Sequence, residues 1–154
     1  DTHDFFGLLR QFKVTRTQGL RLADPEFVKA LPITVVKDLL DLAARTSTPL
    51  MVFVGNAGML QIHSGPIQKV VMIGDWMNVM DPRFNLHVRS DSVAQAWLVR
   101  KPTVDGIVTS VELFNGSGEA IAMFFGERKP GKPELTAWRT LVDELLTRST
   151  AVEA

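Results

Sequence analysis

The sequence lacks cysteine and tyrosine, and several kinds of site are excluded with them. Without cysteine the chain has no disulfide, no thiolate nucleophile, no cysteine-ligated zinc or iron–sulfur centre and no thiolate ligand for a metal cofactor. Without tyrosine it has no tyrosinate ligand either. A chain without disulfides is typical of a reducing cytoplasm, and we expect that location.

Charge of one sign and long apolar runs are also missing. Lys and Arg together number 17, as do Asp and Glu, so no net field attracts nucleic acid or an anionic membrane. No apolar run approaches the roughly 20 residues that span a bilayer. The stretch Asp1–Asp4 has neither the basic nor the apolar region of a signal peptide. We therefore expect no nucleic-acid partner and no membrane insertion.

What the sequence does contain predicts one α+β domain. Its 154 residues suffice for a single hydrophobic core, and 45% of them are hydrophobic. Helical patterns come first, strand patterns follow from Leu50, and another helix closes the chain. This order is typical of an antiparallel sheet flanked by helices. We place the domain at residues 1–147 and expect residues 148–154 to form a frayed tail.

Three helices are predicted ahead of the strands. The first has apolar residues at helical spacing, namely Phe5, Leu8, Leu9 and Phe12. Thr15–Gln18 has the spacing of a capping box and opens a short second helix. Asp24-Pro25 starts a further short turn, and a broad apolar stripe over residues 33–45 marks the third helix. The closing amphipathic helix is expected over residues 135–145.

From Leu50 the apolar residues alternate, or form short runs between turn signals. The expected strands are 50–54, 59–63, 67–73, 77–80, 84–88, 96–99, 108–114 and 120–125. Two glycine-containing tetrapeptides, Gly55–Gly58 and Asn115–Gly118, separate neighbouring strands and predict hairpins.

Three histidines are candidate metal ligands. His63 and His87 lie on expected strands, where a histidine is most often a half-exposed or hydrogen-bonded sheet residue. His3 lies in the first turn of an amphipathic helix beside Phe5 and Phe6, although a histidine this close to the first residue is usually solvated. No spacing such as His-Glu-x-x-His supports any of the three.

Motifs for hydrolysis and nucleotide binding are absent. Neither Gly-x-Ser-x-Gly, a Walker loop nor Gly-x-Gly-x-x-Gly occurs, so we name no catalytic residue. Two segments, Arg100–Thr103 and Gly126–Pro130, place cations directly after apolar strands. Such cations usually guard a solvated sheet edge. The alternative is that they gather at one edge to meet carboxylates or phosphate.

Several segments, in the same order, resemble the C-terminal half of the HemS/ChuS/PhuS family of cytoplasmic haem proteins in Gram-negative bacteria. They are Asp1–Leu9, Val14–Arg16, Met51–Asn56, Ala96–Ser110 and Phe125–Arg128. The similarity runs from residue 1 to about residue 146. Family members are usually about twice this length and consist of two similar halves, each a large antiparallel sheet flanked by helices. The resemblance therefore implies that this chain is a single half, either a fragment or a half-length relative.

The resemblance also implies a cofactor, haem (iron protoporphyrin IX), with His3 as its iron ligand. It places Arg16, Lys101 and Arg128 around the haem propionates, where Arg grips a carboxylate with two hydrogen bonds and Lys supplies a point charge. It makes Met51, Phe53 and Phe125 pocket-lining residues.

Two departures from the family pattern matter. Phe125 stands where relatives commonly carry tyrosine, so a hydrogen bond from that phenol is missing. The distal arginine of the family belongs to the other half, so the distal iron ligand stays open here. If His3 is not the ligand, we favour His87, expected in the same sheet as the pocket, over His63.

The resemblance favours haem binding for intracellular haem trafficking and iron utilisation. Two alternatives stay open. One is a haem-degrading, oxygenase-like activity of the intact two-half protein, because the haem itself supplies the oxidative chemistry. The other is a structural or dimerisation half with weak haem affinity. A haem oxygenase or a haem importer is an expected partner, and a homodimer is considered.

Overall fold

The structure is a computed structural model that describes residues 2–152, with side chains described for Phe5 and residues 7–149. Within that part of the chain, a six-stranded antiparallel sheet has the order β1-β7-β8-β9-β2-β3 and a three-stranded sheet the order β4-β5-β6. The predicted α+β class is therefore confirmed. The helices are α1 (Thr2–Gln11), α2 (Arg16–Leu22), α3 (Val35–Thr46) and α4 (Thr136–Val152). The strands are β1 (Val28–Leu31), β2 (Leu50–Asn56), β3 (Met59–Gly65), β4 (Val70–Ile73), β5 (Trp76–Asp81), β6 (Phe84–Arg89), β7 (Gln95–Thr103), β8 (Gly106–Phe114) and β9 (Ala120–Gly126).

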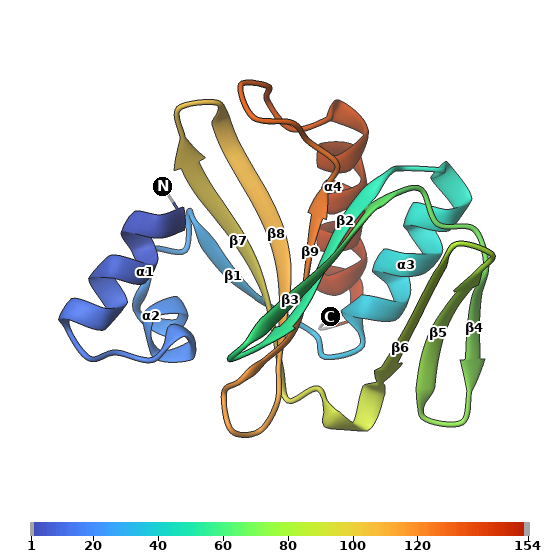
Figure 1. The fold of residues 1–154 in the computed structure, drawn as a ribbon, viewed down its shortest axis with the longest axis horizontal. Helices are drawn as coiled ribbons and strands as arrows, with labels where there is room; N and C mark the ends of the chain where they lie inside the picture. Colours follow the sequence, from blue (N-terminus) through green and yellow to red (C-terminus); the bar gives the residue numbers. More distant parts are fainter. Residues whose placement is uncertain (1, 153–154) are drawn as a thin grey trace.

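The main core lies between the six-stranded sheet and the two longer described helices, α3 and α4 (Figure 1). Burial of apolar side chains between these layers is the main force that holds them together. The three-stranded sheet contributes one face to the same core, through Met77, Val79, Leu86 and Val88. No helix among residues 2–152 is both long and apolar enough to cross a bilayer.

The helices α1 and α2 lie together beside β1 and β7, apart from α3 and α4 (Figure 1). A small second cluster fastens them to the sheet, formed by Leu20, Val28, Val99 and Phe114, with Phe5, Ala23 and Trp97 packed against it. The predicted capping box starts α2, because Gln18 N–H donates to Thr15 Oγ1 at 3.3 Å and Thr15 N–H donates to Gln18 Oε1 at 3.0 Å.

The structure departs from the predicted elements at several places. Asp24-Pro25 forms the expected turn, in which Glu26 N–H donates to Asp24 Oδ1 at 2.8 Å, but the chain then enters β1, which we did not predict. A four-residue strand is too short to show a period. The strand β7 continues to Thr103, past the end expected at residue 99. The strand expected over 67–73 begins only at Val70, since the backbone N–H groups of residues 68 and 69 donate to the Asp81 carboxylate.

The closing helix continues to Val152, beyond residue 145, where its amphipathic pattern ends. The side chains support this extension, because Arg148 Nη2 donates to Glu144 Oε1 at 2.6 Å and Ser149 Oγ donates to the carbonyl of Leu145 at 2.9 Å. Residues 153 and 154 lie outside the described part, and the domain boundary at residue 147 stays a prediction.

Gly126 allows α4 to approach the end of β9, and this contact gives a stability prediction. A Cβ added there would lie 2.6 Å from Cβ and 2.8 Å from Cδ1 of Trp138, whose side chain is fully buried. We expect Gly126→Ala to lower the free energy of unfolding by about 1–3 kcal/mol through overpacking. Gly116→Ala, with nothing within 4 Å of the added atom, is the control. Equal urea midpoints for the two variants would refute the close contact.

Candidate functional site

One face of the six-stranded sheet points away from α3 and α4, and we call it the open face. Side chains alternate between the two faces of a strand, and the register then decides which residues of neighbouring strands share a face. Met51 pairs with Phe125, Phe125 with Ser110, and Ser110 with Val99. The open face therefore carries Met51, Phe53, Trp97, Val99, Lys101, Ser110, Glu112, Met123 and Phe125.

The three predicted pocket-lining residues lie together on this face. Met51, Phe53 and Phe125 are all half-buried. The rings of Phe53 and Phe125 meet edge to face, with centroids 5.1 Å apart and planes inclined by 70°. They form an apolar surface that remains partly accessible, although their role toward a ligand stays a prediction.

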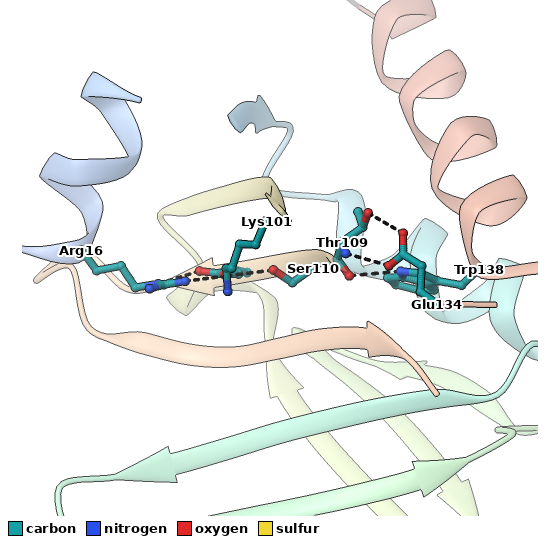
Figure 2. A network of polar contacts seen from close by, with 7 residues as sticks. Arg16, Lys101, Thr109, Ser110, Glu134 and Trp138 are labelled. Atoms are coloured by element: carbon teal, nitrogen blue, oxygen red, sulfur yellow. Dashed lines mark hydrogen bonds and ion pairs between the residues drawn. The ribbon is translucent and has the colours of Figure 1, made fainter. Parts of the chain in front are cut away.

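A buried carboxylate joins two of the predicted cations on the same face (Figure 2). Glu112 has no exposed surface. Arg16 donates from Nε to its Oε2 at 2.8 Å and from Nη2 to its Oε1 at 2.7 Å. Lys101 Nζ lies 3.6 Å from the same Oε1, and Ser110 Oγ donates to it at 2.9 Å. Because Arg16 is the first residue of α2, the bidentate pair also fastens that helix to β8.

The pKa values of Glu112 and Lys101 are both shifted in this cluster. Burial raises the pKa of Glu112, but hydrogen bonds and charge from Arg16, with smaller contributions from Lys101 and Ser110, outweigh burial and hold that pKa below its ordinary value. Burial lowers the pKa of Lys101, Glu112 raises it and Arg16 lowers it, with a net decrease. Two cations share one carboxylate, which leaves one net positive charge beside an apolar surface.

Lys101 lies between this charge cluster and the aromatic surface. Its side chain is almost wholly buried, and its ammonium lies 5.6 Å from the centroid of the Phe125 ring. Such a contact favours a charged ammonium electrostatically. Lys101 lies within β7 and is buried, so it is not a solvated cation at the sheet edge, which is the usual role of a lysine directly after a strand.

Arg128, the third predicted cation, belongs to a separate ion pair. Its Nη2 donates to Asp105 Oδ2 at 2.9 Å in the turn between β7 and β8, and the same oxygen accepts from Gly131 N–H at 3.1 Å. Among the described residues, Arg128 Nε is buried without a hydrogen-bond partner. No contact among them joins Arg128 to Arg16 or Lys101. The structure thus places the three cations in two clusters.

A cavity of about 580 Å³ borders the open face. It extends from Arg16 and Phe53 toward the tips of the β2–β3 and β8–β9 hairpins, and its apolar lining includes Leu60, Phe114, Ile121 and Met123. Apolar concave surface with a few placed polar groups is the usual character of a small-molecule site.

The side chains of His63 and His87 do not reach the open face. His63 pairs with Val52, which points to the core side, and its ring stacks on Phe84 with centroids 3.7 Å apart. Burial lowers its pKa. His87 belongs to the three-stranded sheet, where its Nδ1 lies 2.6 Å from Asn78 Oδ1. The expectation that His87 shares a sheet with the pocket was therefore wrong.

His3 lies in α1, but its side chain is outside the described part of the chain. The described residues contain no group of three or more histidine and carboxylate side chains that suits a metal ion. A haem iron takes its four equatorial ligands from the porphyrin, so one histidine can bind it without a cluster of protein ligands.

Glu112 is the site residue that sequence reasoning missed. It stands in the otherwise apolar run Val111–Phe114, and a glutamate within a buried strand is rarely unpaired. That pattern indicates an ion pair but not its partners, because Arg16 is 96 positions away in the sequence. A second missed carboxylate, Glu134, accepts from the backbone N–H and hydroxyl of Thr109 at 2.7 and 2.9 Å (Figure 2). It lies on the helix-covered side of β8 and serves the packing of α4.

Fold and site together define an α+β domain with an apolar, cation-bearing sheet face. The HemS family, described as "Haemin-degrading HemS.ChuX domain", matches residues 13–145. The hemin transport protein HemS of Yersinia enterocolitica is 40% identical over 151 residues, 98% of this chain and 44% of that protein. The hemin transport protein HmuS of Yersinia pestis is 38% identical over the same length. The chain belongs to the HemS/ChuX family.

Solved structures agree with this assignment. Apo-PhuS, a heme-binding protein from Pseudomonas aeruginosa, is 48% identical and matches with a TM-score of 0.91 over 94% of this chain and 42% of its own. ChuS, described as an E. coli heme oxygenase, is 39% identical with a TM-score of 0.91, over 95% of this chain and 45% of its own. ChuX, at 16% identity and a TM-score of 0.75, shares the fold. The chain thus spans less than half the length of HemS, PhuS and ChuS.

The lowered pKa of Glu112 predicts a pH dependence of stability. A carboxylate with a lower pKa in the folded chain stabilises it fully above the ordinary value of 4.5, and this contribution disappears as the pH falls through the folded-state pKa. We expect the difference in unfolding free energy between the unchanged chain and Glu112→Gln to be largest at neutral pH and to shrink on acidification. Urea denaturation at several pH values measures it. A difference that does not vary with pH would contradict the paired state of Glu112.

Proposed function

We propose that this chain binds haem on its open face for intracellular haem trafficking and iron utilisation. In this proposal His3 is the iron ligand, Arg16, Lys101 and Arg128 meet the haem carboxylates, and Met51, Phe53 and Phe125 contact the porphyrin. The proposal extends to a cytoplasmic location in a Gram-negative bacterium and to a haem oxygenase or haem importer as partner.

The strongest support for the proposal is the position of Lys101 between a buried ion pair and an aromatic surface. A nearly buried ammonium, 3.6 Å from one carboxylate that Arg16 already neutralises, has N–H donors left for an anion. The same ammonium lies against the ring of Phe125. A ligand that matches both neighbours has a flat apolar body and a carboxylate at its edge, and haem is such a molecule.

The remaining residues fit the same ligand. The cavity beside Arg16 and Phe53 adds apolar surface for a porphyrin. Arg128 is partly exposed, and its guanidinium has donors besides the one that Asp105 accepts, so it is a further cation for a carboxylate. His3 and Phe5 belong to the same helix, α1. The ring of Phe5 lies 5.2 Å from the guanidinium carbon of Arg16, so α1 runs beside the cation cluster. A neutral imidazole there supplies the nitrogen that haem iron accepts.

Haem degradation is the second candidate, and two of the comparisons favour it. The family description names haemin degradation, and ChuS is described as a heme oxygenase. When bound, haem supplies the oxidative chemistry, and the protein orients it. Because the chain spans less than half of such relatives, we assign this activity to an intact two-half protein.

A hemin titration tests the iron ligand. We expect the unchanged chain to show a saturable change of the Soret band, and His3→Ala to bind at least about tenfold more weakly, with a shifted band because the axial nitrogen is lost. His87→Ala is the matched control and should leave both unchanged. An unaltered spectrum and affinity in His3→Ala would remove His3 from the ligand role. Loss of the Soret band with ascorbate, with a biliverdin-like product, would favour degradation.

The carboxylate contact is tested separately at Lys101. We expect Lys101→Met, which keeps the unbranched apolar stem of the side chain and removes the charged ammonium, to weaken hemin binding about tenfold, the effect of one charge-assisted hydrogen bond. Lys129→Met, at an exposed lysine, is the control. Equal hemin dissociation constants for the two variants would show that Lys101 does not meet the ligand.

A further inference from the structure

We propose that Glu112 is a positioning residue for ligand binding: it fixes Arg16 on the sheet and supplies the negative charge that keeps the buried Lys101 an ammonium. This inference rests on the proposed function, because the anion that the two cations meet is the haem carboxylate. Glu112 itself has no exposed surface, so it acts through Arg16 and Lys101 and not on the ligand.

The geometry of the carboxylate supports this role. Oε2 accepts from Arg16 Nε, while Oε1 accepts from Arg16 Nη2 and Ser110 Oγ and has Lys101 Nζ 3.6 Å away. Figure 2 shows the guanidinium extending from α2 to β8 in this arrangement. Two parallel hydrogen bonds fix the plane of a guanidinium, so its orientation relative to the open face is set before any ligand arrives.

The charge of Lys101 depends on the same carboxylate. The lysine is flanked by Glu112 on β8, Arg16 on α2 and the ring of Phe125 on β9; among the described residues, the charges that shift its ionisation are those of Glu112 and Arg16. Burial and Arg16 both disfavour the ammonium, and Glu112 favours it. Without Glu112 the lysine would face only another cation in a poorly solvated position.

Replacing Glu112 by glutamine should therefore change the ionisation of Lys101, an effect that is not expected if Glu112 only holds the fold together. The glutamine keeps the size of the side chain and removes its charge, so Lys101 should lose its proton at a lower pH than in the unchanged chain. If haem binding uses this ammonium, raising the pH should weaken binding to Glu112→Gln at a lower pH than it weakens binding to the unchanged chain. Glu112→Asp keeps the charge and should retain the proton on Lys101 over nearly the same range as the unchanged chain.

The first measurement needs no haem. NMR titration of the lysine side-chain resonances in the ligand-free chain, with Lys101→Arg used to assign the signal, follows the ionisation of Lys101. We expect its midpoint to fall in Glu112→Gln relative to the unchanged chain and to stay close to it in Glu112→Asp. An equal midpoint in the Gln variant, or an equal fall in both variants, would overturn the role of the Glu112 charge. If the Gln variant does not fold, Arg16→Gln replaces it: Glu112 then faces Lys101 without a competing cation, so the midpoint of Lys101 should rise, and an unmoved midpoint opposes the role.

The second measurement is the pH profile of the hemin dissociation constant. As the pH rises from neutral, Glu112→Gln should lose affinity at a lower pH than the unchanged chain does, because its Lys101 deprotonates earlier. In Glu112→Gln/Lys101→Arg this extra loss should vanish, since arginine keeps its charge throughout. An extra loss that persists in the double variant would overturn the proposal.

The two measurements separate the inference from the proposed function. If the unchanged chain shows no saturable hemin binding, the proposed function fails, while the ligand-free titration of Lys101 still decides the role of Glu112. If hemin binds and the titration midpoint does not move, the proposed function stands and the role of Glu112 fails.

Discussion

Glu112 is fully buried in the middle of β8, and a carboxylate in that position must be paired or it would oppose folding. Its pairing with Arg16 determines where α2 begins on the sheet, and the small cluster around Leu20 completes that attachment. The helix α1 packs beside α2 through the same small cluster, in which Phe5 takes part. The ion pair therefore also helps to hold in place the helix that contains His3.

Strand β8 has a cluster of polar side chains on each of its two faces, and the two clusters have different roles. On the open face, Ser110 and Glu112 organise cations beside an accessible apolar surface. On the other face, Thr109 engages Glu134 through both its backbone and its hydroxyl, and its carbonyl accepts from Trp138 Nε1 at 3.1 Å. The second arrangement satisfies its polar atoms inside the packed core and leaves no donor for a ligand. Because side chains alternate between the two faces of β8, one set of polar residues packs against α4 and the other lies on the open face.

The sequence predicted the elements whose patterns are local. The hairpins around Gly55–Gly58 and Asn115–Gly118, the capping box at Thr15 and the two long helices all carry their signals within a few residues. The strand β1 was missed because four residues carry no period. The misplacement of His87 had another cause: which strands share a sheet depends on pairing between distant segments, and no local pattern encodes it.

In the candidate site, too, the features that depend on nearby residues could be predicted and those that depend on distant residues could not. That Met51 and Phe53 share a face follows from their spacing of two. The choice of Arg16, Lys101 and Arg128 came from resemblance, and it gave no indication that two of them share Glu112 while the third pairs with Asp105. Such arrangements arise from contacts between residues far apart in the sequence, so they became visible only in the folded chain.

In the proposed function, paired cations on an apolar sheet face recognise the carboxylates of haem. Comparing hemin with its dimethyl ester on the unchanged chain tests this directly, because the ester keeps the iron and the porphyrin and lacks both negative charges. We expect the ester to bind at least about tenfold more weakly, the effect of losing one or more charge-assisted hydrogen bonds. Equal dissociation constants for hemin and its ester would contradict it.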